Sequence, residues 1–135
     1  MTDQAPSLAT KDELLALTGA RRFRTVTLPV SKLTLRLRSL TEGEVSAYHT
    51  RVSVAGSVAS RSARLQSAAR RLFALCLVDA EGNRLLSDDE AETLGEKLDA
   101  ADAQVLYDAC SNHTGINQAD VESLVKNSGA TGDGD

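Results

Sequence analysis

Tryptophan is missing from this chain of 135 residues, and aromatic residues make up only 3% of it. The hydrophobic content of 41% is still enough for one modest core, which must be built from Leu, Val and Ala. No apolar run approaches the ~20 residues that span a bilayer, and no signal peptide opens the chain. We therefore expect a soluble, cytoplasmic protein of ordinary single-domain length.

Signals of catalysis are also scarce. We find no glycine-rich phosphate loop, no nucleophile elbow and no paired metal ligands. Cys76 and Cys110 are too few and too isolated for a disulfide framework or a zinc site, so we expect two buried free thiols. His49 has no ligand partner at a suitable spacing, and His113 is expected to interact with carbonyls at a helix C-terminus. The sequence predicts no enzyme activity, no catalytic residues and no cofactor.

Five arginines surround the expected N-terminal strands: Arg21, Arg22, Arg24, Arg36 and Arg38. A nucleic-acid-binding surface is typically basic overall and carries aromatic side chains that stack on bases. Here the sequence pI is about 5.2 and only Phe23 is available to stack. We expect these arginines on a solvated strand face or opposite acidic residues, and no nucleic-acid or membrane partner.

Charge divides the chain in two. Through Val78 there are 12 Lys or Arg and 5 Asp or Glu, a net charge of +7. From Asp79 onward there are 3 and 14, a net charge of −11. This division either gives the surface two poles that favour self-association, or is neutralised within the fold. Both alternatives stay open at the level of sequence.

Hydrophobic periodicity predicts a predominantly helical α+β fold: an N-terminal β-hairpin, then a small helical bundle with a strand-turn-strand insertion near residues 76–86. One hairpin face should bury Phe23, Val26, Leu28, Leu33, Leu35 and Leu37. Helices are expected over 10–18, 42–52, 59–75, 87–95, from 99 through at least 110, and over 117–126, with a break around Gly56. We predict an arm with a short helix (1–20), one globular domain (21–127) and a disordered acidic, glycine-rich tail (128–135).

The segment from Leu72 to Leu94, LFALCLVDAEGNRLLSDDEAETL, permits two interpretations. As a calcium loop it places Asp79, Glu81, Asn83 and Glu90 at ligand positions. However, Arg84 stands where the sharp bend needs glycine, and it would put a cation beside the metal. As a turn, Asp79 and Asn83 bond to nearby amides and Gly82 supplies the positive φ. The turn explains every residue and is favoured, so no metal site is predicted.

Three stretches carry a family resemblance: LTLRLRSLTEGEV, the Leu72–Leu94 segment, and LDAADAQVLYDACSNHTGI with its Leu106–Ala109 helix and Asn112. Over about Lys32 to Asn127 the chain resembles the tail assembly chaperones of long-tailed bacteriophages and prophages. The resemblance implies a non-enzymatic role in which the protein binds the tape measure protein, gives way to tail tube protein, and self-associates.

The resemblance also implies action in the host cytoplasm and absence from the mature virion. Under this hypothesis the Ala/Leu stripe from Leu65 to Leu75 and the helix around Leu106 build the core or a groove, while the partner-binding residues remain unknown. Two alternatives stay open. One is a structural virion component, such as a head–tail connector or tail protein. The other is a calcium-binding regulatory module that uses the loop of residues 79–90.

Overall fold

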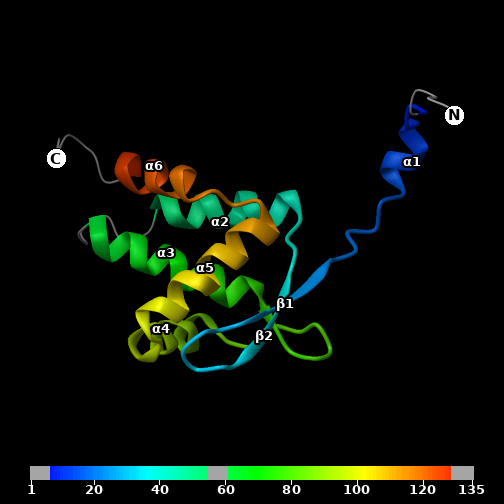
Figure 1. The fold of residues 1–135 in the computed structure, drawn as a ribbon. Helices are drawn as coiled ribbons and strands as arrows, with labels where there is room; N and C mark the ends of the chain where they lie inside the picture. The colour runs from blue at the N-terminus through cyan, green and yellow to red at the C-terminus, as the bar shows by residue number, and fades with distance from the viewer. Residues whose placement is uncertain (1–6, 55–60, 129–135) are drawn as a thin grey trace, which may run out of the picture.

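Six helices and a three-stranded sheet make up the residues that the structure, a computed structural model, describes: 7–54 and 61–128 (Figure 1). In chain order they are α1 (Lys11–Leu15), β1 (Phe23–Thr27), β2 (Thr34–Arg38), α2 (Glu42–Val54), α3 (Arg61–Cys76), β3 (Leu77–Val78), α4 (Asp88–Lys97), α5 (Ala100–Thr114) and α6 (Gln118–Ser128). The predicted fold class, α+β and predominantly helical, is confirmed. The break expected around Gly56 and tail residues 129–135 lie outside the described residues, and Ser128 is the last residue of α6.

Apart from α3, whose predicted start near residue 59 lies outside the described residues, the helices begin at or next to the predicted positions. Capping boxes join Thr10 to Glu13 and Ser87 to Glu90, because each hydroxyl accepts the N3 amide and each carboxylate accepts the N-cap amide. Thr41 and Glu44 make the same exchange before α2. These reciprocal bonds satisfy amides that a helix start otherwise leaves unpaired.

Helix ends depart from prediction at three points. α1 stops at Leu15 instead of near Thr18. α4 continues through Gly95 to Lys97, because the glycine lies under a side chain of α3 instead of ending the helix. Cys76 was expected in a strand, but it is the last residue of α3, and β3 consists of Leu77 and Val78 alone.

The strands form an antiparallel sheet in the order β1-β2-β3. The register pairs Phe23 with Arg38 and Val26 with Leu35, so Phe23 and Val26 point to opposite faces. The prediction that Phe23 shares the buried face is therefore wrong. Phe23 is 42% exposed, and the Cζ of the Arg36 guanidinium lies 4.0 Å from the centroid of its ring. Leu37 is buried, whereas Leu33, also expected on the buried face, is 58% exposed near the hairpin tip.

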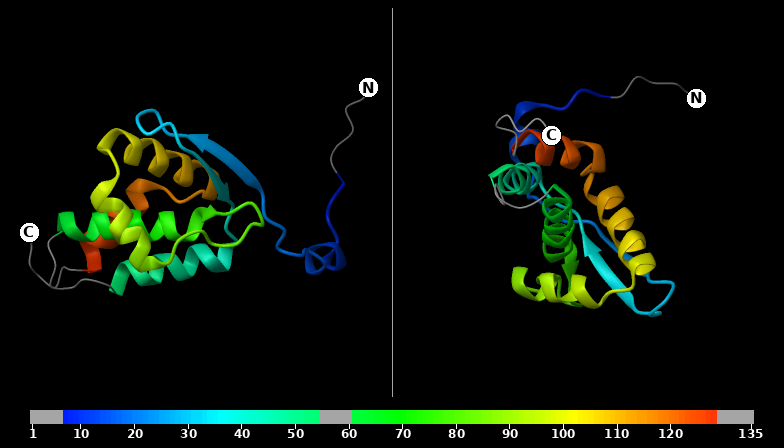
Figure 2. Two further views of the ribbon diagram at one scale, coloured as in Figure 1. Left: turned by 90° about the horizontal axis from the view of Figure 1, so that it is seen from below. Right: turned by 90° about the vertical axis from the view of Figure 1, so that its left-hand side faces the viewer.

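The hydrophobic core is centred on α3, which packs against α2, α4, α5 and α6 (Figures 1 and 2). Its buried residues include Leu72, Phe73 and Cys76, which meet Leu106 and Cys110 of α5 in one cluster. The core is aliphatic with little aromatic content, as the composition predicted. Within the described ranges, no helix is long and apolar enough to cross a membrane.

Asp102, a fully buried carboxylate of α5, holds the hairpin tip against the helices. Its two oxygens accept the backbone amides of Val30 at 2.7 Å and Ser31 at 2.9 Å. Burial alone would raise the pKa of Asp102, but these amide bonds outweigh burial and the pKa is lowered. The sheet and the helical layer are therefore joined by a charged hydrogen-bonded contact across 72 positions of sequence.

Candidate functional site

A groove between α3, α4 and α5 is the best candidate for a binding surface. It has a volume of about 410 Å³. Its floor is formed by Phe73 and by Val121 of α6, both almost fully buried. Its walls combine small residues with half-buried larger ones: Leu65, Ala69, Gly95, Leu98, Ala100, Ala103 and Tyr107. The exposed side chains of Gln66 and Gln104 stand at the rim.

One face of α3 builds the core and a neighbouring face builds this groove. Ala68, Leu72 and Cys76 are buried in the core. Leu65 and Ala69 lie on the neighbouring face of the helix, where they are only partly buried and line the groove. The predicted Ala/Leu stripe of α3 therefore serves both purposes. Leu106 lies wholly in the core, and the groove is lined instead by its neighbours Ala103 and Tyr107.

Arg70 fixes the wall between α3 and α4. Its Nη1 donates to Glu92 at 2.9 Å and to Glu96 at 3.1 Å. To reach them, the side chain passes over Gly95, and a Cβ added there would collide with the guanidinium. A side chain at this helical position would therefore displace the Arg70 guanidinium from its carboxylate partners. The hydrogen bond with Glu92, followed by that with Glu96, raises the pKa of Arg70 against the opposing effect of burial.

The segment of residues 79–90 forms a turn and a helix start. Asp79 Oδ1 accepts the amides of Glu81 at 2.9 Å and Asn83 at 3.0 Å, and Gly82 adopts φ +86°. These are the contacts that the turn interpretation predicts. Glu90, the last candidate ligand, caps Ser87. No group of three or more His, Cys, Asp or Glu side chains in the described parts of the chain could hold a metal ion.

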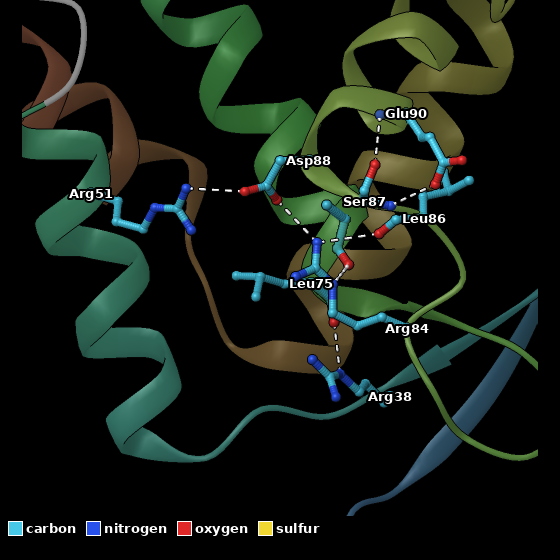
Figure 3. Close-up of polar contacts among 9 residues, drawn as sticks. Arg38, Arg51, Leu75, Arg84, Leu86, Ser87, Asp88 and Glu90 are labelled. Carbon is cyan, nitrogen blue, oxygen red and sulfur yellow. Dashed lines mark hydrogen bonds and ion pairs between the residues drawn. The ribbon is translucent and has the colours of Figure 1, made fainter.

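Arg84, the residue that disfavoured the calcium loop, binds the C-terminal end of α3 (Figure 3). Its Nε donates to the Ala74 carbonyl at 2.9 Å, and one Nη donates to Leu86 and Asp88. Asp88 also accepts Arg51 of α2 at 3.1 Å (Figure 3). Burial would raise the pKa of Asp88, but the bonds from Arg51 and Arg84 lower it overall. This network joins α2, α3 and α4.

The hairpin arginines also bind backbone and carboxylate oxygens. Arg38 Nε donates to the Leu75 carbonyl at 2.7 Å, beside the Ala74 carbonyl that Arg84 binds (Figure 3). Arg36 donates to the Ala80 carbonyl at 2.8 Å. Arg21 makes a two-pronged ion pair with Glu44 at 2.6 and 2.7 Å. Arg21 thus connects the entry of β1 to α2, Arg38 connects β2 to the end of α3, and Arg36 connects β2 to the turn after β3.

Histidines and cysteines take structural positions. His113 is buried near the C-terminus of α5, where its Nε2 lies 3.0 Å from the Arg22 carbonyl, and Arg22 donates in return to the His113 carbonyl. His113 therefore pairs with the residue that precedes β1, and not, as predicted, with the last carbonyls of its own helix. His49 stands apart in α2, and its ring packs beside Tyr48.

The prediction of two buried free thiols is confirmed for Cys76 and Cys110. A hydrogen bond between the two sulfur groups, together with burial, raises the pKa of the Cys110 thiol. Because the thiolate is the reactive form, a raised pKa keeps this thiol unreactive.

Ion pairs join the basic and acidic parts of the chain. Among the described residues, Arg51–Asp88, Arg70–Glu92 and Arg70–Glu96 connect the two halves. These pairs favour the interpretation that the charge division is at least partly neutralised within the fold.

The architecture defines a small helical protein with a mainly apolar groove between α3, α4 and α5. Neither the protein-family models nor the curated proteins gave a match to this chain. Among solved structures, the fold is similar to that of the tail assembly chaperone of bacteriophage HK97. The TM-score is 0.50 at 22% sequence identity, and the match covers 75% of this chain and 89% of that chain. At this identity the comparison establishes a shared fold.

Proposed function

We propose that this protein is a non-enzymatic tail assembly chaperone of a long-tailed phage or prophage, which binds the tape measure protein during tail assembly. The observation that carries the proposal is the similarity in fold to the HK97 chaperone over 89% of that chain. The sequence resemblance over about Lys32 to Asn127 points to the same family independently of the fold comparison. Fold alone does not define function, so the proposal depends on a binding test.

The groove offers a physical basis for binding. A tape measure protein exposes long helices with apolar faces before assembly, and such faces aggregate when they are uncovered. A helix docks by inserting its apolar side chains into a hydrophobic groove, at positions spaced three or four residues apart. The groove between α3 and α5 supplies apolar walls and a polar rim of Gln66 and Gln104. We propose this groove as the tape measure site.

The test is co-expression with the tape measure protein encoded in the same genome. The wild-type chain should raise the soluble fraction of the tape measure protein and co-purify with it. Ala103→Glu places a carboxylate in the groove wall and should abolish both effects. Ala101→Glu is the matched control, because Ala101 is an exposed residue of the same helix that does not line the groove. A tape measure protein that stays insoluble and unbound in the presence of the wild-type chain would refute the proposal.

The tail tube protein and the finished particle provide a second test. A chaperone that gives way to tube subunits should be displaced from the tape measure protein when tail tube protein is added. It should also be missing from purified virions. Mass spectrometry that found the chain in virions at stoichiometric amounts would favour a structural virion component instead.

A further inference from the structure

The β-sheet has an open edge along the outer side of β1. Among the described strands, the order β1-β2-β3 gives β1 a neighbour on one side only. The Arg22 carbonyl accepts the Ser39 amide at 2.8 Å, so the backbone groups of Arg22 face β2. Backbone groups alternate in direction along an antiparallel strand, so those of Phe23, Thr25 and Thr27 face away from β2. In the described part of the chain these outward amides and carbonyls have no backbone partner.

This edge is regular and exposed. From Phe23 to Thr27 the register against β2 is continuous, without a bulge, and the strand contains no proline. All of its residues except Val26 are exposed. α1 precedes β1 but stands away from the rest of the fold in all three views (Figures 1 and 2). A regular exposed edge is a template on which a further strand can pair through backbone hydrogen bonds.

The charge around the edge favours an acidic partner. Residues 21–38 contain six Lys or Arg and no Asp or Glu. Other arginines of the hairpin bind oxygen atoms of their own chain, whereas the exposed Arg24 has no hydrogen bond or ion pair with the described residues. A second copy of the chain would bring another basic hairpin to the edge, and like charges on adjacent strands are destabilising. An acidic strand would instead pair with the basic edge.

We propose that the open edge of β1 binds an extended acidic segment of another protein, which adds as an antiparallel strand with a carboxylate opposite Arg24. Because the backbone of Arg24 bonds to β2, Arg24 forms a non-hydrogen-bonded pair with the added strand, and side chains lie closest in such pairs. The carboxylate can therefore reach the guanidinium. The next residues of the added strand exchange backbone bonds with Phe23 and Thr25, and apolar side chains there lie beside the Phe23 ring.

The size of the edge defines the strength of the contact. A five-residue strand buries less than the ~1,000 Å² of a stable specific interface, so we expect a dissociation constant on the order of 100 μM. The ion pair is exposed, so added salt should weaken binding. The proposal does not rest on the tape measure role, because β1 contributes no residue to the lining of the groove.

The experiment is fluorescence anisotropy of the full chain with a labelled, capped peptide of about seven residues, in which Glu alternates with Val or Thr. Wild type should bind this peptide. Thr25→Pro removes an outward amide and no bond to β2, and it should weaken binding about tenfold. Arg24→Gln should weaken binding about two- to fivefold. Thr25→Val keeps the amide, and Lys97→Gln removes the same charge from α4, so both controls should bind as wild type.

Methylation of the peptide separates strand addition from general charge attraction. In the proposed register the Val and Thr amides of the peptide face β1, and the Glu amides face away from it. Methyl groups on the Val and Thr amides should therefore abolish binding, whereas methyl groups on the Glu amides should leave it. This comparison uses the wild-type protein, so it decides the matter even if circular dichroism shows that Thr25→Pro does not fold.

Hydrogen exchange measured by NMR locates the contact. The amides of Phe23, Thr25 and Thr27 should exchange more slowly when the peptide is bound. The same protection in concentrated protein without peptide would show that a second copy occupies the edge, and it would overturn the proposal. So would a peptide that fails to bind at millimolar concentration, equal binding of the two methylated peptides, or tighter binding of a single-stranded oligonucleotide than of the peptide.

The groove variant Ala103→Glu separates this contact from the proposed function. It should bind the acidic peptide as wild type does, because Ala103 lines the groove and β1 does not. Loss of peptide binding in this variant, with the fold intact, would show that the peptide docks in the groove and would contradict strand addition. Peptide binding by the wild-type chain would stand even if the tape measure protein did not bind.

Discussion

At the scale of single residues, the arginines of the hairpin act as ligands for backbone carbonyls. Arg38 binds the Leu75 carbonyl at the C-terminal end of α3, where the helix dipole places negative charge. Burial, followed by repulsion from Arg21, lowers the pKa of Arg38, so the bond to Leu75 compensates for an unfavourable environment. This contact anchors the central helix of the bundle to the sheet.

We expect Arg38→Met to lower the free energy of unfolding by about 1–3 kcal/mol, because it leaves a part-buried carbonyl without its charged donor. Urea denaturation at pH 7 measures the loss. Arg24→Met is the control, since Arg24 is an exposed neighbour in the same hairpin, and it should change the value by less than about 0.5 kcal/mol. Equal losses in the two variants would show that the carbonyl contact has no special contribution.

Glu44 makes stability depend on pH. Its hydrogen bond with Arg21 overcomes burial and lowers the pKa of Glu44 from 4.5 to about 2. A depressed carboxylate pKa stabilises the folded state above the unfolded pKa, and this contribution is lost as the pH falls through the folded pKa. The relevant window therefore runs from about pH 4.5 down to about pH 2.

We expect Glu44→Gln to cost about 1–2 kcal/mol at pH 7, after solvent screening of a pair whose side chains are about 30% exposed. The difference from wild type should shrink steadily between pH 4.5 and pH 2. Urea titrations at several pH values measure it. Glu42→Gln, in the same first turn of α2, serves as the control. A difference that stays constant over this window would contradict the assignment.

At the scale of elements, the turn between β3 and α4 requires one glycine. Gly82 adopts φ +86°, and a Cβ there would lie 3.4 Å from Phe23. We expect Gly82→Ala to destabilise the fold by about 1–2 kcal/mol, the cost of a left-handed L-residue. Gly43→Ala should have the opposite sign and stabilise by up to about 1 kcal/mol, because Gly43 lies in α2 with space around it. Thermal and urea unfolding of both variants measure the pair, and stabilisation by Gly82→Ala would contradict the turn.

Local signals predicted the elements better than their contacts. The capping boxes at Thr10, Thr41 and Ser87 and the Asp79 turn were visible in sequence because each involves residues no more than four positions apart. The face of Phe23 was mispredicted because Phe23 lies three positions before Val26, and strict alternation along a strand puts two such residues on opposite faces. The register, which the sequence pattern did not determine, then places Phe23 beside Arg36.

Long-range contacts had no sequence signal of their own. Gly95 was interpreted as a helix end, since nothing in the local sequence shows that Arg70 crosses it. The same limit applies to β3, which pairs with β2 across about forty residues. The groove likewise needs Ala69, Gly95 and Ala103 brought together from three helices. The stripe on α3 indicated an apolar surface, but only the packing separates its core face from its groove face.

At the scale of the whole molecule, the sheet and the bundle stabilise one another through few but specific links. Asp102 holds the hairpin tip, Arg38 holds the end of α3, and Arg51 connects α2 to α4 through Asp88. All these links fall between residues 21 and 128, the part of the chain that contains the hydrophobic core. The arm lies outside them, which separates a folded body from a projecting segment.

The arm should therefore contribute little to the stability of the fold. Deleting residues 1–17 removes all four exposed leucines of the arm but no residue of the core cluster. We expect the free energy of unfolding to change by less than about 0.5 kcal/mol and the urea m-value to stay constant, because m follows the surface exposed on unfolding. A shortened chain that unfolds at a markedly lower urea concentration would show instead that the arm packs on its own body.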